Sequence, residues 1–232
     1  VRIGDESRTS TAVIDPTSNL QTEINEAGPE VAEAELGVLI DKLRYLAKGA
    51  DLVVLAGSLP REVPVDFYAT LVREVHRHGV VCAVDASGRA LRQALAAEPA
   101  FVSPNRREAE EIVGHEFEDD ADEALCQMGA GSALIHDEAG CVARLRDGRT
   151  RHTWRARLDA LPEVVSTVGS GDAFLAGFLS AWYAKEAPEQ ALRLAVACGA
   201  ANTQSLGAGV FDPADVDAFA RQVDVSPIPD PE

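Results

Sequence analysis

The chain has 232 residues, and its 46% hydrophobic and 25% charged residues are typical of a folded globular protein. The 38 acidic residues outnumber the 21 basic ones, which gives a formal charge of −17 and argues against a nucleic-acid partner. No apolar run approaches the ~20 residues of a membrane-spanning helix, so no membrane is expected as a partner. The four cysteines lack a CxxC spacing, which indicates reduced thiols in a cytoplasmic protein.

A β-hairpin is the first predicted element. Alternating residues at 11–14 and 21–24 flank turn-forming residues at 15–19. Two strands alone are only marginally stable, so the hairpin needs partner strands or a domain that it covers. The first residues have the pattern of the middle of a strand and not of its start. We therefore expect part of the parent protein to precede residue 1.

From residue 30 onward, helical and strand patterns alternate. This alternation predicts an α/β fold with a mostly parallel sheet and helices on both faces. Pro64 is expected at the first position of its helix, and the Asp147-Gly148 pair is expected in a hairpin turn. The predicted helices span 29–48, 64–78, 89–97, 106–113, 120–127, 171–185, 188–206 and a segment that begins at Asp212; the predicted strands span 51–56, 80–84, 100–103, 132–135, 141–145 and 150–154.

Four polar segments follow predicted strands. Ligands of parallel sheets bind outside the carboxyl ends of the strands, so these segments are the candidates for chemistry. They are Gly57–Pro60, Asp85–Gly88, Ser103–Asn105 together with Glu108, and Gly169–Asp172.

The last of these segments places two glycines before an apolar helix. Gly169 and Gly171 would let backbone N–H groups face an anion at the helix N-terminus, and Asp172 could then act as a base on a hydroxyl. The alternative is an ordinary helix start with an acidic residue in its first turn. The segment is neither a Walker loop nor a Rossmann fingerprint, because it lacks both spacings.

Asn105 and Glu108 lie three residues apart at the start of a predicted helix. A capping pair explains that spacing by structure alone. The functional alternative is a site in which both residues hold Mg²⁺ through waters near a nucleotide phosphate.

In this order the motifs resemble those of the PfkB (ribokinase-like) carbohydrate kinases, most closely the branch of 1-phosphofructokinase and tagatose-6-phosphate kinase. The resemblance covers essentially the whole chain. It implies a three-layer ribokinase-like fold in which residues 1–28 are part of a β lid and residues 29–232 form the nucleotide-binding kinase core. The segments that carry it are Thr22–Glu30, Gly57–Pro60, Asp85–Gly88, Ser103–Glu108 and Val165–Asp172.

The resemblance also implies roles for individual residues. Asp172 matches the catalytic base, and Gly169, Ser170 and Gly171 match an anion hole for the γ-phosphoryl group. Arg8 resembles a lid residue that contacts the sugar phosphate, although an exposed strand arginine stays open as the alternative. Asn105 and Glu108 match the motif that governs Mg²⁺, and the residues assigned to the nucleotide are Ser103, Asn105, Asp137, Gly140, Gly199 and Asn202.

The expected function is ATP-dependent phosphorylation of a sugar phosphate, fructose 1-phosphate or tagatose 6-phosphate, with ATP and Mg²⁺ required. A homodimer through the lid strands is an expected assembly. Two alternatives stay open: a nucleotide-binding module without catalysis, and a nucleoside or vitamin kinase of the same superfamily. Arg8 favours a phosphorylated sugar over a neutral nucleoside.

The chain departs from the family pattern at three places. Ser103 stands where the family has Lys, and Asp137 stands where it has Gly, so ATP affinity is expected to be weakened. His136 is expected to be a solvated loop residue. The opening βαβ unit of the family, roughly 80 residues, has no counterpart, so we expect the 232-residue chain by itself to be inactive.

Overall fold

The computed structural model describes residues 1–15, 17, 20–114, 120–159 and 164–229. The chain forms two compact units. The first comprises Val1–Val102 and Gln127–Ala130, and the second comprises Ser103–Cys126 and Gly131–Glu232. Among the described residues, no helix is long and apolar enough to cross a membrane.

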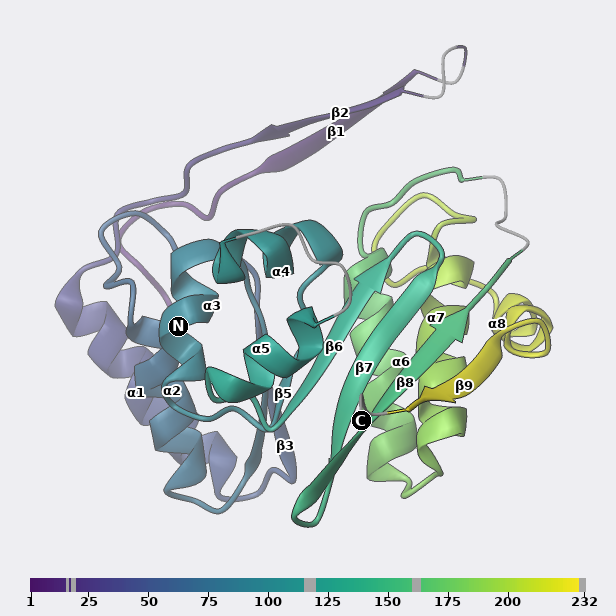
Figure 1. Cartoon of the computed structure of the whole chain (residues 1–232). Coiled ribbons are helices and arrows are strands. Elements are labelled where there is room, and N and C mark those ends of the chain that lie inside the picture. The colour runs from purple at the N-terminus through teal and green to yellow at the C-terminus, as the bar shows by residue number, and fades with distance from the viewer. Residues whose placement is uncertain (16, 18–19, 115–119, 160–163, 230–232) are drawn as a thin grey trace. The chain divides into compact units, whose positions relative to one another are not determined.

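The first unit contains a two-stranded ribbon and a group of parallel strands (Figure 1). The predicted hairpin is confirmed: β1 (Ser10–Asp15) pairs antiparallel with β2 (Leu20–Asn25), while turn positions 16, 18 and 19 lie outside the described residues. The parallel strands follow in the order β3 (Leu52–Ala56), β4 (Val81–Asp85) and β5 (Phe101–Val102). The helices of this unit are α1 (Glu33–Ala47), α2 (Phe67–His76) and α3 (Gly88–Leu95).

The expected position of Pro64 is wrong. Helix α2 begins at Phe67 with Asp66 as its N-cap residue, three residues after the proline. The carbonyl of Pro64 accepts a hydrogen bond from the N–H of Phe67 at 2.9 Å, so the proline lies in the turn that leads into the helix. Proline disfavours a helical conformation of the residue before it, but it does not fix where the next helix starts.

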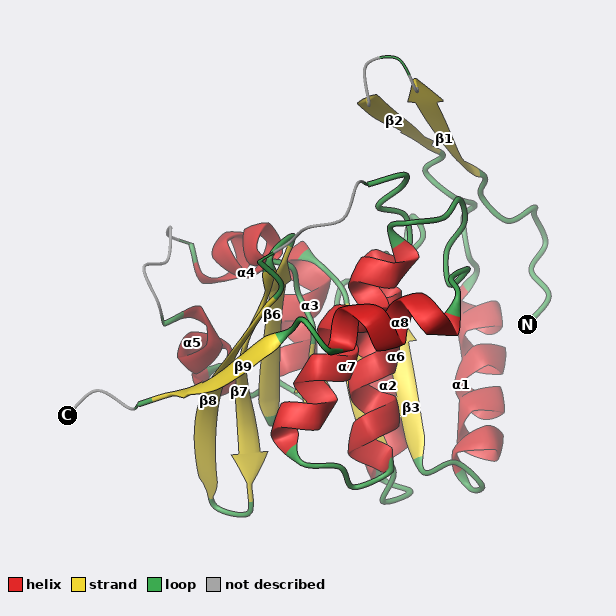
Figure 2. Ribbon diagram, turned by 90° about the vertical axis from the view of Figure 1, so that its right-hand side faces the viewer, coloured by secondary structure: helices red, strands yellow, loops and turns green. Residues whose placement is uncertain are grey.

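The strands of the second unit pair antiparallel, and helices lie on both of their faces. Helices α4 (Arg106–Val113) and α5 (Ala121–Gln127) cover one face, and α6 (Ser170–Tyr183), α7 (Pro188–Asn202) and α8 (Pro213–Ala220) cover the other (Figure 2). The strand order is β6 (Ser132–Asp137), β7 (Gly140–Asp147), β8 (Thr150–Arg157) and β9 (Asp224–Ile228), and each neighbouring pair is antiparallel. The predicted hairpin turn at Asp147-Gly148 is confirmed.

Two features at the C-terminal end differ from the prediction. Helix α7 ends at Asn202 instead of continuing to residue 206, because a glycine-containing loop follows in which Gly207 and Gly209 adopt positive φ. Strand β9 was expected to be part of a helical region. It contains Pro227, which a strand tolerates at the edge of a sheet, and β9 is the last strand in the order.

Candidate active site

A glycine-rich turn precedes helix α6 in the second unit. Gly169 is the N-cap residue, with a φ of 81° in the left-handed region. A Cβ atom at this position would lie 2.5 Å from the Cβ of Ala208, closer than atoms of that kind approach. Both the backbone conformation and the contact with Ala208 therefore require glycine.

The first turn of α6 offers N–H groups to an anion. The N–H and the hydroxyl of Ser170 both donate to the carbonyl of Thr167, at 3.2 and 3.0 Å. In the described part of the chain, the N–H groups of Gly171 and Asp172 have no hydrogen-bond acceptor, as expected for the start of a helix. The exposed carboxylate of Asp172 lies in this same turn. The N–H groups that could bind an anion and the carboxylate that could act as a base therefore lie in the same turn.

His136 packs beneath this turn, and the expectation of a solvated loop histidine is wrong. It lies on β6, its ring centroid is 5.0 Å from that of Phe174, and a Cβ at Gly171 would lie 3.4 Å from its Cε1. Burial lowers the pKa of His136, and this effect outweighs a hydrogen bond with the backbone of Ser103 and the nearby charge of Asp137. The neutral imidazole is therefore the form that fits this position.

Asn105 and Glu108 form a reciprocal capping box at the start of α4. The Oδ1 of Asn105 accepts from the N–H of Glu108 at 2.9 Å, and the Oε2 of Glu108 accepts from the N–H of Asn105 at 2.9 Å. Among the described residues, the second carboxylate oxygen of Glu108 has no such contact. The described residues hold no cluster of three or more His, Cys, Asp or Glu side chains that could bind a metal. Mg²⁺ needs only one or two carboxylates when waters and phosphates complete its shell, so this donor set fits it.

Three predicted nucleotide residues have positions that packing and pairing explain. Ser103 is fully buried, and among the described residues its hydroxyl has no hydrogen-bond partner. Asp137 is exposed, and its Oδ1 accepts from the N–H of Ala139 at 2.9 Å within the β6–β7 turn. A Cβ atom at Gly140 would overlap the carbonyl oxygen of Ala156, so glycine is needed there for strand pairing.

The last two predicted nucleotide residues lie on α7. A Cβ atom at Gly199 would lie 3.4 Å from both the Cβ of Phe174 and the carbonyl oxygen of Ser170, so this glycine lets α7 approach α6. Asn202 is fully buried, and its carboxamide bonds to the backbone on both sides. Its Nδ2 donates to the carbonyl of Val168 at 2.8 Å, and its Oδ1 accepts from the N–H of Gly209 at 2.7 Å.

Comparison with known proteins agrees with these motifs. Residues 1–215 match the model of the pfkB family of carbohydrate kinases. The chain belongs to this family. It is therefore a sugar kinase by family, and the α/β ribokinase-like fold expected from the sequence is confirmed.

Solved structures of other PfkB-type kinases share this fold. Escherichia coli phosphofructokinase-2 in complex with potassium matches with a TM-score of 0.84 and 24% identity, over 95% of this chain and 72% of that one. A Thermotoga maritima protein provisionally assigned as a 1-phosphofructokinase matches with a TM-score of 0.82 and 21% identity, over 97% and 72%. A Staphylococcus aureus protein provisionally assigned as a phosphofructokinase has 26% identity and a TM-score of 0.76, over 90% and 68%.

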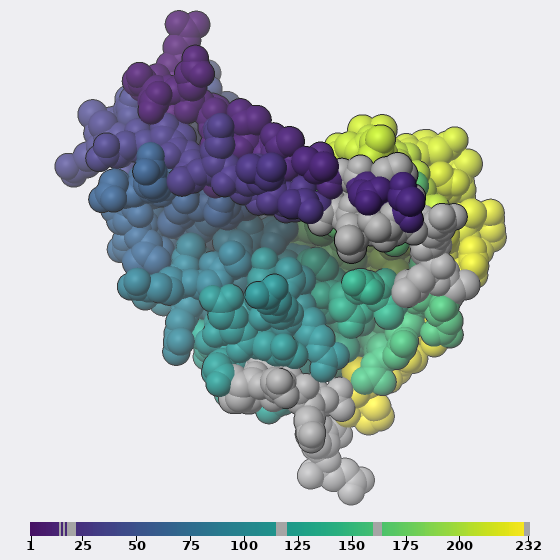
Figure 3. All heavy atoms as spheres, turned by 90° about the horizontal axis from the view of Figure 1, so that it is seen from above, coloured from purple at the N-terminus to yellow at the C-terminus, as the bar shows by residue number. Residues whose placement is uncertain are grey.

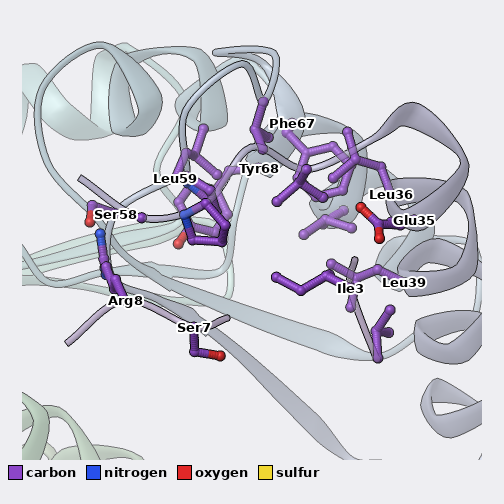
Figure 4. Close-up of a pocket in the computed structure, with 17 residues that line it drawn as sticks. Ile3, Ser7, Arg8, Glu35, Leu36, Leu39, Ser58, Leu59, Phe67 and Tyr68 are labelled. Atoms are coloured by element: carbon purple, nitrogen blue, oxygen red, sulfur yellow. The ribbon is translucent and has the colours of Figure 1, made fainter. Parts of the chain in front are cut away.

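Arg8 of this PfkB-family chain belongs to the first unit and lines a pocket there. The pocket has a volume of about 420 Å³, and its lining is mainly apolar. In Figure 4, the Arg8 guanidinium points toward Ser58 at one end, while Ile3, Leu36 and Leu39 lie at the other. Burial raises the pKa of Tyr68, and the positive charge of Arg8 partly offsets this effect.

The sequence did not indicate which residues contact the glycine-rich turn: Ala208 was not singled out, and His136 was expected in solvent. Ala208 and His136 contact it, but neither belongs to a recognisable motif. An alanine in a loop and a histidine at the end of a strand give no signal by residue type. Only the buried polar environment of Asn202 could have been suspected, because a carboxamide inside an apolar helix needs partners.

Proposed function

We propose that this sugar kinase transfers the γ-phosphoryl group of ATP to a hydroxyl of a sugar phosphate, with fructose 1-phosphate as the first candidate and tagatose 6-phosphate as the second. The observation that carries the proposal is the start of α6, where unbonded N–H groups and the exposed Asp172 carboxylate share one turn. Phosphoryl transfer needs this combination, because negative charge must be held while a hydroxyl loses its proton.

In the proposed reaction, Asp172 accepts the proton of the acceptor hydroxyl. The hydroxyl oxygen forms a bond to the γ-phosphorus, the bond between this phosphorus and the β–γ bridging oxygen breaks, and ADP leaves. The N–H groups of Gly169 and Gly171 and the dipole of α6 stabilise the charge of the group in transfer. The neighbouring Ser170 holds the turn together through its bonds to Thr167.

Mg²⁺ would be held through waters by the free carboxylate oxygen of Glu108, with Asn105 beside it. When bound, it supplies positive charge that offsets the charge of the triphosphate. The nucleotide itself would lie near the residues at the ends of β6 and α7, which include Asp137 and Gly199. Asp137 weakens this binding if its carboxylate faces a phosphate.

Arg8 supports a phosphorylated acceptor over a nucleoside or a vitamin. Its guanidinium can bond to a phosphate through two N–H groups, whereas a neutral nucleoside offers it no charge. The pocket beside Arg8 also carries the hydroxyl of Ser58. ADP release measured with several sugar phosphates, their unphosphorylated sugars and nucleosides would rank these acceptors.

The test of the activity is Asp172→Asn. Asparagine keeps the size of the side chain but cannot accept the proton, so kcat should fall by at least ~10²-fold while the Kd for ATP stays within about twofold. The matched control is Asp215→Asn, because Asp215 holds the same position in the first turn of α8. Near-normal turnover by the Asp172 variant would show that the base lies elsewhere.

A nucleotide-binding module without catalysis is the second candidate. The observation that favours it is the capping box, because each of its two side chains already has a structural contact. Calorimetric binding of ATP without ADP release from any acceptor would support this candidate. Release of ADP that depends on one sugar phosphate would exclude it.

A further inference from the structure

Two segments that are distant in sequence lie side by side at the start of α6. The N–H groups of Val165 and Ser166 both donate to the carbonyl of Thr203, at 2.8 and 3.2 Å. Ala208 lies against Gly169. The loop of residues 203–209, which follows α7, therefore runs along the segment that leads into the glycine-rich turn. Part of this loop lies on the surface, where its atoms are coloured yellow-green in Figure 3.

Asn202 links the two segments through its side chain. Its Nδ2 donates to the carbonyl of Val168 at 2.8 Å, and its Oδ1 accepts from the N–H of Gly209 at 2.7 Å. The residue is 0% exposed, so water does not compete for either bond. A buried carboxamide that loses one partner keeps an unsatisfied polar group, so both bonds are strongly favoured.

The bond to Val168 fixes the orientation of the next N–H group. The Val168–Gly169 peptide is trans and planar, so its carbonyl and its N–H point in opposite directions. Asn202 draws the carbonyl toward the buried side. The N–H of Gly169 must then point away from that side. Because Gly169 has the φ freedom of glycine, its peptide would otherwise have other orientations open to it.

We infer that Asn202 is a positioning residue: it orients the Gly169 N–H as a donor to the transferred phosphoryl group and couples this donor to the order of loop 203–209. The inference rests on the proposed function of the same site. It gives Asn202 a role through the backbone of the turn instead of through contact with the nucleotide. A donor oriented before the reaction needs no rearrangement as charge develops, so its effect falls on kcat more than on KM.

The variant that tests this inference is Asn202→Asp. Aspartate keeps an acceptor for the Gly209 N–H but loses the donor to Val168, and its second oxygen repels that carbonyl. We expect kcat to fall about 10- to 100-fold, with the KM for the sugar phosphate within about twofold of wild type. The matched control is Ser132→Ala, which breaks a different hydrogen bond between a buried side chain and the backbone of the same unit, the one that the Ser132 hydroxyl accepts from the N–H of Arg146.

Hydrogen exchange gives a readout that does not need activity. In Asn202→Asp, the Gly209 amide should keep its protection, while the Ser170 amide, which donates to Thr167, should exchange at least about tenfold faster because the turn is freed. Ser132→Ala should change neither. If wild type phosphorylates no acceptor, the proposed function fails, and exchange still decides whether Asn202 orders the turn.

Three results would overturn the inference. The first is unchanged Ser170 exchange in Asn202→Asp. The second is a loss of kcat in Asn202→Asp that is no larger than the loss of kcat in Ser132→Ala when the two variants lose the same unfolding free energy. The third result comes from wild type alone and applies if the Asn202 variant does not fold. The inference predicts that the exchange of the Ser170 and Gly209 amides of wild type responds alike to denaturant. Protection factors of these two amides that differ by more than about tenfold would contradict the coupling.

Discussion

Glu108 combines a helix-capping contact with a carboxylate oxygen that is left for a cation. Glu108→Gln separates the two roles, because glutamine can still accept from the Asn105 N–H but carries no charge. We expect it to lose no more than about 1 kcal/mol of unfolding free energy and to need several-fold more Mg²⁺ for half-maximal rate. Glu108→Ala should also lose the cap, worth about 0.5–2 kcal/mol.

Thermal unfolding and Mg²⁺ titration of activity measure the two effects. Glu111→Gln is the control, since Glu111 is an exposed acid of the same helix. An unchanged Mg²⁺ requirement in both Glu108 variants would mean that Glu108 is a capping residue alone.

His136 makes the stability of the second unit depend on pH. Its pKa is lowered in the folded protein, so between that pKa and the ordinary value of 6.5 the unfolded chain binds more protons than the folded one. Stability is therefore full above about pH 6.5 and falls as the pH drops toward the folded pKa. The slope from one such group is at most about 1.4 kcal/mol per pH unit.

His136→Leu should flatten this slope, because leucine fills a similar volume and does not titrate. Urea unfolding at about pH 5, 6 and 7.5 measures it. His76→Gln on α2 is the control, because it removes an exposed histidine. Equal slopes in wild type and His136→Leu would assign the pH dependence to other groups.

At the scale of elements, the glycine-rich turn and helix α6 respond differently to added side chains. Gly169→Ala brings a Cβ against Ala208 at a φ of 81°, so we expect a loss of about 2–4 kcal/mol. Gly171→Ala lies within the helix, where its Cβ meets only the ring edge of His136 at 3.4 Å, and should change stability by less than about 1 kcal/mol.

Denaturant unfolding compares the two variants, and the double variant Gly169→Ala/Ala208→Gly identifies the cause. Removing the Cβ of Ala208 should restore part of the loss, while the strain of positive φ remains. If the double variant were no more stable than Gly169→Ala, the contact with Ala208 would have no part in the requirement for glycine.

The elements with long periodic patterns were predictable, and their ends were less so. Helices α1 and α6 follow from their apolar patterns, the start of α4 from its capping pair, and the ribbon β1–β2 from alternation around a turn; Asp212 caps α8 as expected. The end of α7 and strand β9 depend on what they pack against. Besides the positive φ of Gly207 and Gly209, non-local bonds fix the end of α7: the N–H of Gly209 donates to Asn202, and the N–H groups of Val165 and Ser166 donate to the carbonyl of Thr203. Local sequence does not encode these bonds.

The motifs of the site were likewise predictable as positions, but their contacts were not. Spacing alone could not distinguish a metal ligand from a capping partner at Glu108, and the structure contains the capping contact. It also could not indicate that Ser103 is buried or that Asp137 bonds to its own turn. Such facts depend on which side of an element faces the core, and non-local packing decides that.

For the molecule as a whole, a large negative charge opposes self-association, whereas exposed apolar side chains favour it. The formal charge of −17 makes copies of the chain repel one another at low salt. In the first unit, β3 ends the strand order, and Val54 on it is 45% exposed. On helix α1, which precedes β3 in the chain, Val38, Tyr45 and Leu46 are also more than half exposed. Edge strands with apolar side chains are templates for association.

We therefore expect self-association through β3 that increases with salt. The Debye length shrinks from about 30 Å at 0.01 M to about 3 Å at 1 M salt, so repulsion fades while apolar contact persists. Val54→Lys should keep the chain monomeric at high salt, because it places a charge on the exposed strand. Sedimentation velocity at both salt concentrations measures this. Val13→Lys on the β1–β2 ribbon, where Val13 is 52% exposed, is the matched variant. If it dissociated the copies and Val54→Lys did not, the ribbon would be the interface.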